Sequence, residues 1–260
     1  MTLHETVVDG VATITMDNPP VNALGVADTY GLATMLDSYR MRTDIRAVVL
    51  AAKGRGFCAG VDIKEIQATD ADGGYLGLLE ANRSCGEAFR AVYECAVPVV
   101  AAVNGFCLGS GIGLVGNADV IVAVEGAGFG LPEVDNGALG AATHLMRLVP
   151  SHRARWMLYS CEPATAEELH AYGSVLRVVA PDDLATVASE VAATIAAKDP
   201  DVMRAAKESM NGIDPVDVRT SYRFEQGFTF ELNLLGRGDE ARSAFLRGER
   251  DANSAADCRA

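Results

Sequence analysis

The chain has 260 residues, of which 49% are hydrophobic and 22% charged, and its formal net charge is −13. These proportions are ordinary for a globular protein and exclude intrinsic disorder. The acidic balance argues against general nucleic-acid binding, because a negative surface repels phosphate backbones. A chain of this length suits one domain with a small appended region.

The patterns of cysteine, histidine and apolar residues indicate the cellular compartment and whether a metal or membrane site is present. The six cysteines form no Cys-x-x-Cys pair and the four histidines show no metal-ligand spacing. The N-terminal residues lack a signal-peptide pattern, and the longest apolar run, at residues 97–103, is too short to span a bilayer. We therefore expect a cytoplasmic protein with reduced thiols, no metal site and no membrane partner.

Taken in chain order, strand, loop and helix patterns recur. Apolar alternation and continuous apolar runs predict strands at residues 5–8, 11–16, 47–52, 97–103, 119–124 and 175–180. Helical spacing predicts helices at residues 26–40, 81–94, 110–117, 141–148, 151–159, 164–172 and 184–197. The recurrence predicts an α/β fold, with a core over residues 1–198 and a helical region over residues 199–260.

The linking segments also have distinct compositions. Residues 54–60 and 104–109 are expected to be loops, and the Asp/Gly-rich segment 67–80 is expected to form a mobile lid. Asp199 and Pro200 are interpreted as a hinge, beyond which helix is expected to about residue 250.

The two glycine-rich loops lie where buried strands pass into helices, at residues 56–65 and 104–113. Such turns expose backbone N–H groups at the positive end of a helix dipole. Two of them side by side would direct two donors at one oxygen, an oxyanion hole suited to a thioester carbonyl becoming an enolate. For either loop alone, tight packing of strand against helix is the competing explanation.

A dinucleotide fingerprint, G-x-G-x-x-G, is also present at residues 111–116. Its glycines fall inside the predicted helix rather than in the turn before it, and no acidic residue follows at the required distance. Dinucleotide binding is therefore not favoured.

Four segments resemble motifs of the enoyl-CoA hydratase/isomerase, or crotonase, superfamily. They are PVNAL at residues 20–24, AGVDIKE at 59–65, PVVAAVNG at 98–105 and FGLPE at 129–133. The resemblance covers nearly the whole chain in the same order. It implies a ClpP/crotonase-like spiral of ββα units, with a C-terminal helical region that assembles homotrimers or dimers of trimers.

The same resemblance assigns roles to individual positions. It implies that the N–H groups of Val61 and Ser110 form the oxyanion hole and that Glu133 is the general base; otherwise Glu133 is a surface acid at a helix start. The positions that correspond to coenzyme A contacts in the family are Ala23, Ala59, Ile63 and Lys64. In the family, a basic C-terminal side chain of a neighbouring subunit often contacts the 3′-phosphate of coenzyme A. Arg247 and Arg250 are the candidates for this contact, or else they are solvated helix charges.

One departure from the family pattern affects the reaction. Hydratases carry two catalytic glutamates, and the first of these falls on Gly113. Syn addition of water to an enoyl thioester requires two carboxylates, whereas isomerases of the family use one at the Glu133 position. Simple hydration is therefore disfavoured, and Gly113 is expected to open space for a bulky or cyclic acyl group.

Asp135 and His144 are secondary catalytic candidates. His144 suits acid–base chemistry near neutral pH, or is a helix residue bonded to backbone. Residues 92–99, 131–145 and 225–233 resemble an actinobacterial branch of the family that opens a ring of the indene-type acyl-CoA left from steroid rings C and D. In that reaction water attacks a ring ketone, a C–C bond breaks and an enolate leaves.

The expected function is thus hydrolytic ring opening of a cyclic oxo-acyl-CoA, with coenzyme A as part of the substrate and no permanently bound cofactor. Within enzymes, the alternative is an enoyl-CoA hydratase or isomerase of fatty-acid degradation. From another class, the alternative is a non-catalytic crotonase-fold protein that binds coenzyme A. Turnover of any thioester would exclude the non-catalytic hypothesis and leave the two enzyme hypotheses.

Overall fold

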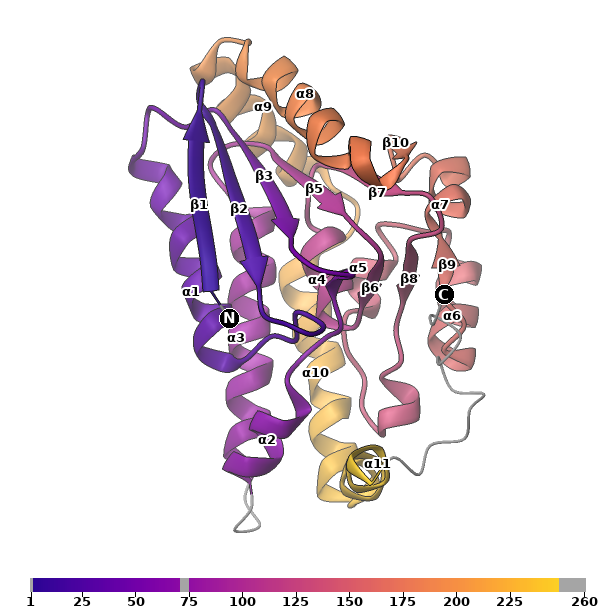
Figure 1. Ribbon diagram of the computed structural model, residues 1–260. Helices are drawn as coiled ribbons and strands as arrows, with labels where there is room; N and C mark the ends of the chain where they lie inside the picture. Colours follow the sequence, from indigo (N-terminus) through magenta and orange to yellow (C-terminus); the bar gives the residue numbers. More distant parts are fainter. Residues whose placement is uncertain (1, 71–74, 248–260) are drawn as a thin grey trace.

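The computed structural model describes residues 2–70 and 75–247. Its larger sheet has the strand order β1-β2-β3-β5-β7-β10, and every pair is parallel except the β1–β2 hairpin (Figure 1). The strands are Thr2–Val8, Val11–Asp17, Ala47–Ala52, Val99–Val103, Val120–Val124 and Arg177–Val179. The predicted hairpin, buried strands and α/β class are confirmed.

A second, smaller sheet was not predicted. Its order is β4-β6-β8-β9, formed by Gly56–Cys58, Phe106–Leu108, Gly128–Gly130 and Ala164–Thr165. The expected loops at 54–60 and 104–109 therefore each contain a strand, β4 and β6, which pair with one another in parallel. Strands of three residues leave no periodicity to read, and only their partners from distant segments define them.

The chain advances through repeated ββα units. Each of the pairs β3/β4, β5/β6 and β7/β8 gives one strand to each sheet. Helices α2 (Ile63–Thr69) and α3 (Leu76–Tyr93) follow the first pair, and α4 (Ser110–Val115) follows the second. The 3-10 helix η2, Val134–Asn136, follows the third. The predicted spiral of ββα units is confirmed.

Helix α3 begins five residues earlier than predicted. The Asp70 carboxylate accepts hydrogen bonds from the N–H groups of Gly77 at 2.7 Å and Leu78 at 3.2 Å, which satisfies the first turn. Much of the segment expected to be a lid is thus helical, in α2 and α3. Residues 71–74 of that segment lie outside the described residues.

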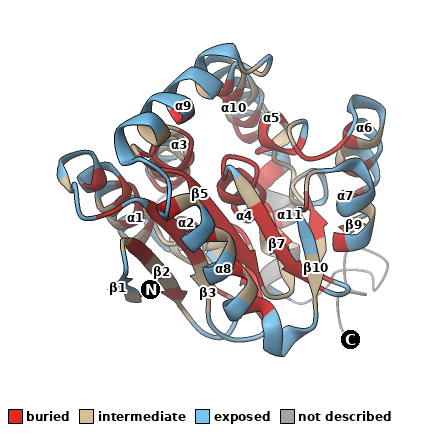
Figure 2. Cartoon of the chain, turned by 90° about the horizontal axis from the view of Figure 1, so that it is seen from above, coloured by how far each residue is buried: buried red, intermediate tan, exposed pale blue. Residues whose placement is uncertain are grey.

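The remaining helices complete the covering layers. They are α1 (Val26–Ser38), α5 (Ala142–Leu145), α6 (Ser151–Ser160), α7 (Ala166–Tyr172) and α8 (Leu184–Ala196), with the 3-10 helices η1 (Tyr39–Met41) and η3 (Pro181–Asp183). Figure 2 shows β3, β5 and β7 almost wholly buried, with exposed residues on the outer sides of α8 and α9.

The C-terminal region is helical as predicted but is divided into three helices. These are α9 (Pro200–Ile213), α10 (Val218–Leu234) and α11 (Arg237–Leu246). Pro215 follows α9, and the Asp217 carboxylate caps α10 by accepting from the Thr220 N–H at 3.0 Å. The predicted helix to residue 250 extends beyond the described residues.

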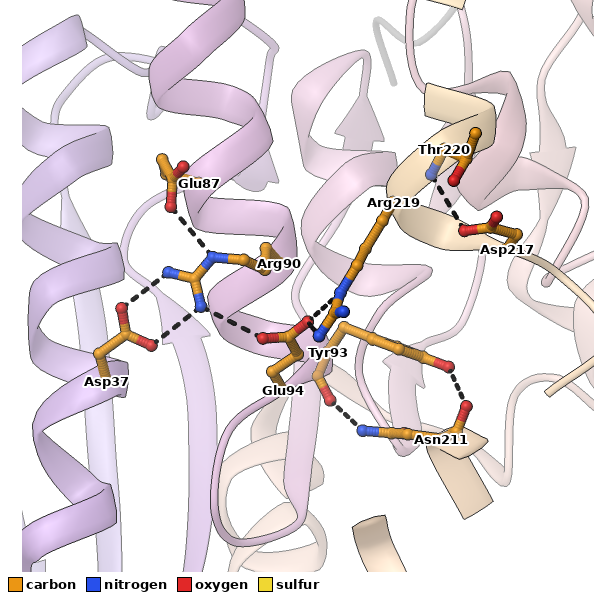
Figure 3. A network of polar contacts seen from close by, with 9 residues as sticks. All are labelled: Asp37, Glu87, Arg90, Tyr93, Glu94, Asn211, Asp217, Arg219 and Thr220. Atoms are coloured by element: carbon orange, nitrogen blue, oxygen red, sulfur yellow. Dashed lines mark hydrogen bonds and ion pairs between the residues drawn. The ribbon is translucent and has the colours of Figure 1, made fainter. Parts of the chain in front are cut away.

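A polar network fastens this region to α3 (Figure 3). Arg219 of α10 binds Glu94, which also binds Arg90 of α3. The Tyr93 hydroxyl donates to the Asn211 carbonyl of α9 at 2.8 Å, and the Asn211 amide donates back to the Tyr93 carbonyl at 2.7 Å. Helix α10 is thereby held along α3 and α5.

Candidate functional site

The first glycine-rich loop is fixed by pairing with the segment before α1. Leu24 and Val61 form a parallel bridge, in which the Leu24 N–H donates to the Gly60 carbonyl at 2.8 Å. The Asp62 carboxylate then caps α2 by accepting from the N–H groups of Lys64 at 3.0 Å and Glu65 at 3.3 Å. Asp62 therefore holds the loop, and Val61, which forms the bridge, directly precedes this cap.

The second loop lies directly against the first. An ideal Cβ placed on Gly60 would be 4.0 Å from the Ser110 nitrogen, so the segments bearing Val61 and Ser110 are in contact. Within the described part of the chain, neither the Val61 nor the Ser110 N–H donates a hydrogen bond to protein. Two donors from separate loops are thus left for an external acceptor.

Glu133 places its carboxyl beside these donors. An ideal Cβ on Gly109 would be only 2.6 Å from Glu133 Oε1, so the carboxyl lies against the backbone that precedes Ser110. The Glu133 backbone begins η2 near the surface, but Oε2 is buried and has no hydrogen-bond partner among the described residues. The alternative that Glu133 is a surface acid is therefore wrong, because its side chain is buried.

Burial is also the main electrostatic influence on this acid. It raises the pKa of the Glu133 carboxyl to about 8, because the charged form loses its hydration, and the nearby charge of Glu225 acts in the same direction. An acid that titrates near neutral pH can both accept and donate a proton, which is the requirement for general acid–base catalysis.

These groups share one small cavity of about 90 Å³. Val61, Ser110 and Glu133 line it together with side chains from α2, α3 and α10 and the segment before α5. The lining is largely apolar, with Asn82 and Thr229 among its few polar side chains. The arrangement can hold one oxygen against two N–H groups and move a proton beside it.

The buried thiol of Cys58 contacts both glycine-rich loops. Cys58 Sγ accepts a hydrogen bond from the Gly60 N–H at 3.4 Å and lies 4.0 Å from Ser110 Oγ. Burial raises the pKa of the Cys58 thiol to about 11, so it is protonated and unsuited to nucleophilic attack. Its position instead sets the spacing of the two loops.

The space expected at Gly113 is filled. An ideal Cβ on Gly113 would lie 2.1 Å from Cζ of Phe89, whose ring comes from α3 and covers the glycine. The expectation that Gly113 leaves room for a bulky acyl group is wrong, because the ring of Phe89 takes that room. Phe89 itself lines the Glu133 cavity, so an aromatic ring lies near where the family's first glutamate would project.

Replacing Gly113 with alanine is expected to destabilise the protein by about 1–3 kcal/mol, because overpacking of a well-filled core has this cost. The added methyl group must displace Phe89, which is held by the rings of His144 and Tyr222. Urea unfolding would measure the effect. Adding Phe89→Leu should recover part of the loss, and a fully stable single variant would contradict the contact.

His144 is wholly buried and lies behind Phe89. The Asn117 amide donates to the Gly113 carbonyl at 2.6 Å and meets His144 Nδ1 at 3.0 Å. Burial lowers the pKa of His144 to about 3, with Arg147 acting in the same direction. This environment does not suit proton transfer near neutral pH, and the partner of His144 is the Asn117 side chain rather than backbone.

The other sequence candidates divide into two groups. Ala23 and Ala59 flank the Leu24–Val61 bridge, and Ile63 and Lys64 begin α2, so the structure brings the four expected coenzyme A positions to one rim beside Val61. Asp135 is exposed on η2 and does not line the Glu133 cavity.

Tyr93 and Arg247 do not line that cavity. Tyr93 binds Asn211 rather than facing the cavity. Arg247 is exposed after α11, and Arg250 lies outside the described residues.

Sequence reasoning missed Glu225. Its carboxylate, on α10, accepts from the N–H groups of Ala142 at 2.9 Å and Thr143 at 3.3 Å, which caps α5 from a separate helix. Ala141, at the N-cap position, has a φ of 62° and offers no side chain for the purpose. The bonded residues are more than 80 positions apart, so no local pattern marks them.

Two negative findings concern the described residues, 2–70 and 75–247. No group of three or more His, Cys, Asp or Glu side chains gathers there in a way that would hold a metal ion. Over the same residues, every helix is too short or too polar to cross a bilayer.

Comparison with known proteins gives a family match. The family described as enoyl-CoA hydratase/isomerase matches residues 6–232. Among solved structures, an enoyl-CoA hydratase/isomerase from Xanthobacter autotrophicus Py2 superimposes with a TM-score of 0.84 at 26% identity, covering 98% of this chain and 95% of that one.

Two curated relatives are more similar in sequence. Both bear the name (7aS)-7a-methyl-1,5-dioxo-2,3,5,6,7,7a-hexahydro-1H-indene-carboxyl-CoA hydrolase. The protein from Rhodococcus jostii (strain RHA1) is 60% identical over 92% of this chain and 91% of its own length. The protein from Mycobacterium tuberculosis is 57% identical over 92% of this chain and 95% of its own length.

Proposed function

Because the chain belongs to the enoyl-CoA hydratase/isomerase family and has its crotonase fold, we propose that it is an acyl-CoA hydrolase that opens a ring of a bicyclic oxo-acyl-CoA in steroid breakdown. The observation that carries this proposal is that Glu133 is the one acid among the described residues that line the cavity. Glu133 lies beside the N–H groups of Val61 and Ser110, while Phe89 covers Gly113, where a second carboxylate would be needed for hydration.

The reaction follows from these positions. Glu133 takes a proton from water as the water oxygen attacks a ring carbonyl carbon, and the C–C bond beside that carbonyl breaks. The electron pair enters an enolate conjugated with the thioester, and the N–H groups of Val61 and Ser110 stabilise its oxygen. Glu133 then returns the proton to carbon, so one water is consumed and a new carboxylic acid remains.

Substrate binding and assembly belong to the same proposal. Ala23, Ala59, Ile63 and Lys64 would contact the coenzyme A portion at the rim of the site. We propose a cytoplasmic homotrimer or dimer of trimers. Large apolar side chains exposed on the C-terminal helices support the assembly. The most exposed of these apolar side chains are Ile213, Phe224, Leu234 and Leu235. The five cysteines among the described residues are all free and buried, which supports a reducing compartment.

A substrate comparison tests the function. The purified protein is incubated with the bicyclic dioxo-indene-carboxyl-CoA and, separately, with crotonyl-CoA, and products are identified by mass spectrometry. Ring opening is expected as the gain of one water by the bicyclic thioester, with little change in crotonyl-CoA. Rapid hydration of crotonyl-CoA with no reaction of the bicyclic compound would replace the proposal with an ordinary hydratase. Binding without turnover of either would indicate a non-catalytic protein.

Replacing Cys58 with alanine is expected to lower kcat about tenfold with little change in KM. Without the thiol the two loops are positioned less firmly, and the loss to the oxyanion in the transition state is about the strength of one hydrogen bond. Cys58→Ser keeps a hydrogen-bonding group between Gly60 and Ser110 and should recover most of the loss. Steady-state kinetics on the bicyclic thioester would measure both variants. Equal kcat values for wild type and Cys58→Ala would exclude the positioning role.

A further inference from the structure

A second cavity, of about 360 Å³, lies between α3 and α10 and has no role in the reaction described above. It shares the side chains of Asn82, Phe89 and Tyr222 with the Glu133 cavity, so side chains rather than backbone divide the two. The Glu133 cavity, at about 90 Å³, is smaller than the roughly 300 Å³ at which ligand pockets begin, whereas the second cavity falls within that range.

The position of the second cavity is well fixed. The Gln226 side chain of α10 donates to the Asn82 carbonyl of α3 at 2.8 Å, and the Arg219–Glu94 contact in Figure 3 joins the same two helices. Gly86 lies on the α3 wall, and an ideal Cβ there would be 3.9 Å from both Tyr222 and Gln226, an ordinary contact distance. The absence of a side chain at Gly86 therefore keeps this part of the cavity open.

His144 carries an unpaired donor at the wall of this cavity, behind the rings of Phe89 and Tyr222. The Asn117 amide nitrogen has two hydrogens; one goes to the Gly113 carbonyl and the other to His144 Nδ1, which must then accept. The proton of the neutral imidazole is consequently on Nε2. That atom is buried and has no partner among the described residues, and His144 lines the cavity. The imidazole ring lies against Phe89 of α3 and Tyr222 of α10.

We infer that the second cavity receives part of the acyl group and that His144 Nε2–H donates a hydrogen bond to a carbonyl oxygen which the acyl group retains. This inference rests on the proposed function, since it names how that substrate is recognised. The rings of Phe89, Tyr222 and His144 lie against one another, with centroids 4.8 to 5.2 Å apart, and supply an apolar surface for a fused ring. A buried donor that has no protein partner favours an oxygen-bearing ring over a hydrocarbon one.

Binding to a catalytically inactive protein tests the inference without turnover. The Glu133→Gln protein and its double variant with His144→Phe are titrated calorimetrically with the dioxo thioester. A second titration uses an analogue in which the oxo group that is not attacked is a methylene. The single variant is expected to bind the dioxo thioester about 10- to 100-fold more tightly than the analogue, and His144→Phe should abolish this preference. His152→Phe, a change at an exposed histidine of α6, is the control and should leave the preference unchanged.

A cavity-filling variant keeps the test independent of His144 itself. Gly86→Leu should weaken binding of both thioesters, while folding is preserved because leucine has the higher helix propensity. Gly227→Leu, on α10 with open space around it, is the matched control. Equal preference with and without His144, or unchanged binding by Gly86→Leu, would overturn the inference. If wild type fails to open the ring, the proposed function fails, whatever these titrations give.

Discussion

Replacing Glu133 with glutamine is expected to lower kcat on the bicyclic thioester by about a thousandfold, because proton transfer by a positioned acid–base contributes on the order of 100- to 10,000-fold. Glutamine keeps the size of the side chain beside Gly109, so substrate binding should change little. Steady-state kinetics with matched CoA-binding measurements would separate the two effects. A variant with near-normal kcat would remove Glu133 from the mechanism.

The wild-type pH profile should show the same group. Burial raises the pKa of Glu133 to about 8, so at pH 7 only about one molecule in ten holds it as the base. Log kcat/KM is expected to rise with pH and level off above about pH 8, and the Glu133→Gln variant should lack this rise.

Stability should change with pH in the opposite direction. A buried acid with a raised pKa contributes stability that is fully present below its unfolded pKa of 4.5 and is lost as pH rises through about 8. Glu133→Gln should therefore be more stable than wild type at about pH 9, by on the order of 2 kcal/mol, with the difference shrinking below about pH 5. Urea unfolding at the two pH values measures this, and a difference that does not vary with pH would contradict the burial of the carboxyl.

Replacing Gly109 with alanine is expected to lower kcat/KM by about a hundredfold to a thousandfold, the usual effect of losing one oxyanion-hole donor. Gly109 has a φ of 56° and a ψ of −117°, a conformation open mainly to glycine. Its Cβ would also lie 2.6 Å from Glu133 Oε1 and 3.3 Å from the Gly60 Cα. Relief of these contacts must move the acid or the two loops apart.

Gly126→Ala is the control for backbone strain alone. Gly126 has a φ of 70°, but a Cβ there would meet no atom within 4 Å. This variant should lose about 1 kcal/mol of stability and keep its activity. Equal kinetic losses in the Gly109 and Gly126 variants would mean that strain, rather than displacement of the site, causes the effect.

Local chemistry made part of the fold and site predictable. The apolar run at β3 predicted a strand buried on both faces. The two glycine-rich turns predicted neighbouring N–H donors. Glu133 was identified from the motif around it, and the structure adds the burial that raises its pKa.

Contacts between distant segments account for what was missed. Phe89 belongs to the interior of α3, and nothing in its sequence neighbourhood indicates that its ring covers Gly113. Glu225 caps α5 from another helix, and Asp70 caps α3 from seven residues upstream. His144 looked like a residue suited to proton transfer because its ordinary pKa is near neutral, and only its burial behind Phe89 changes that.

The most direct test of the central claim is to open the ring in water labelled with heavy oxygen and to locate the label by mass spectrometry. If Glu133 directs water to a ring carbonyl, one heavy oxygen must appear in the newly formed carboxylic acid, and the thioester must remain intact. A label found instead in a hydroxyl on the acyl chain would indicate hydration. A label found in an acid released together with free coenzyme A would indicate thioester hydrolysis, and either result would contradict the account.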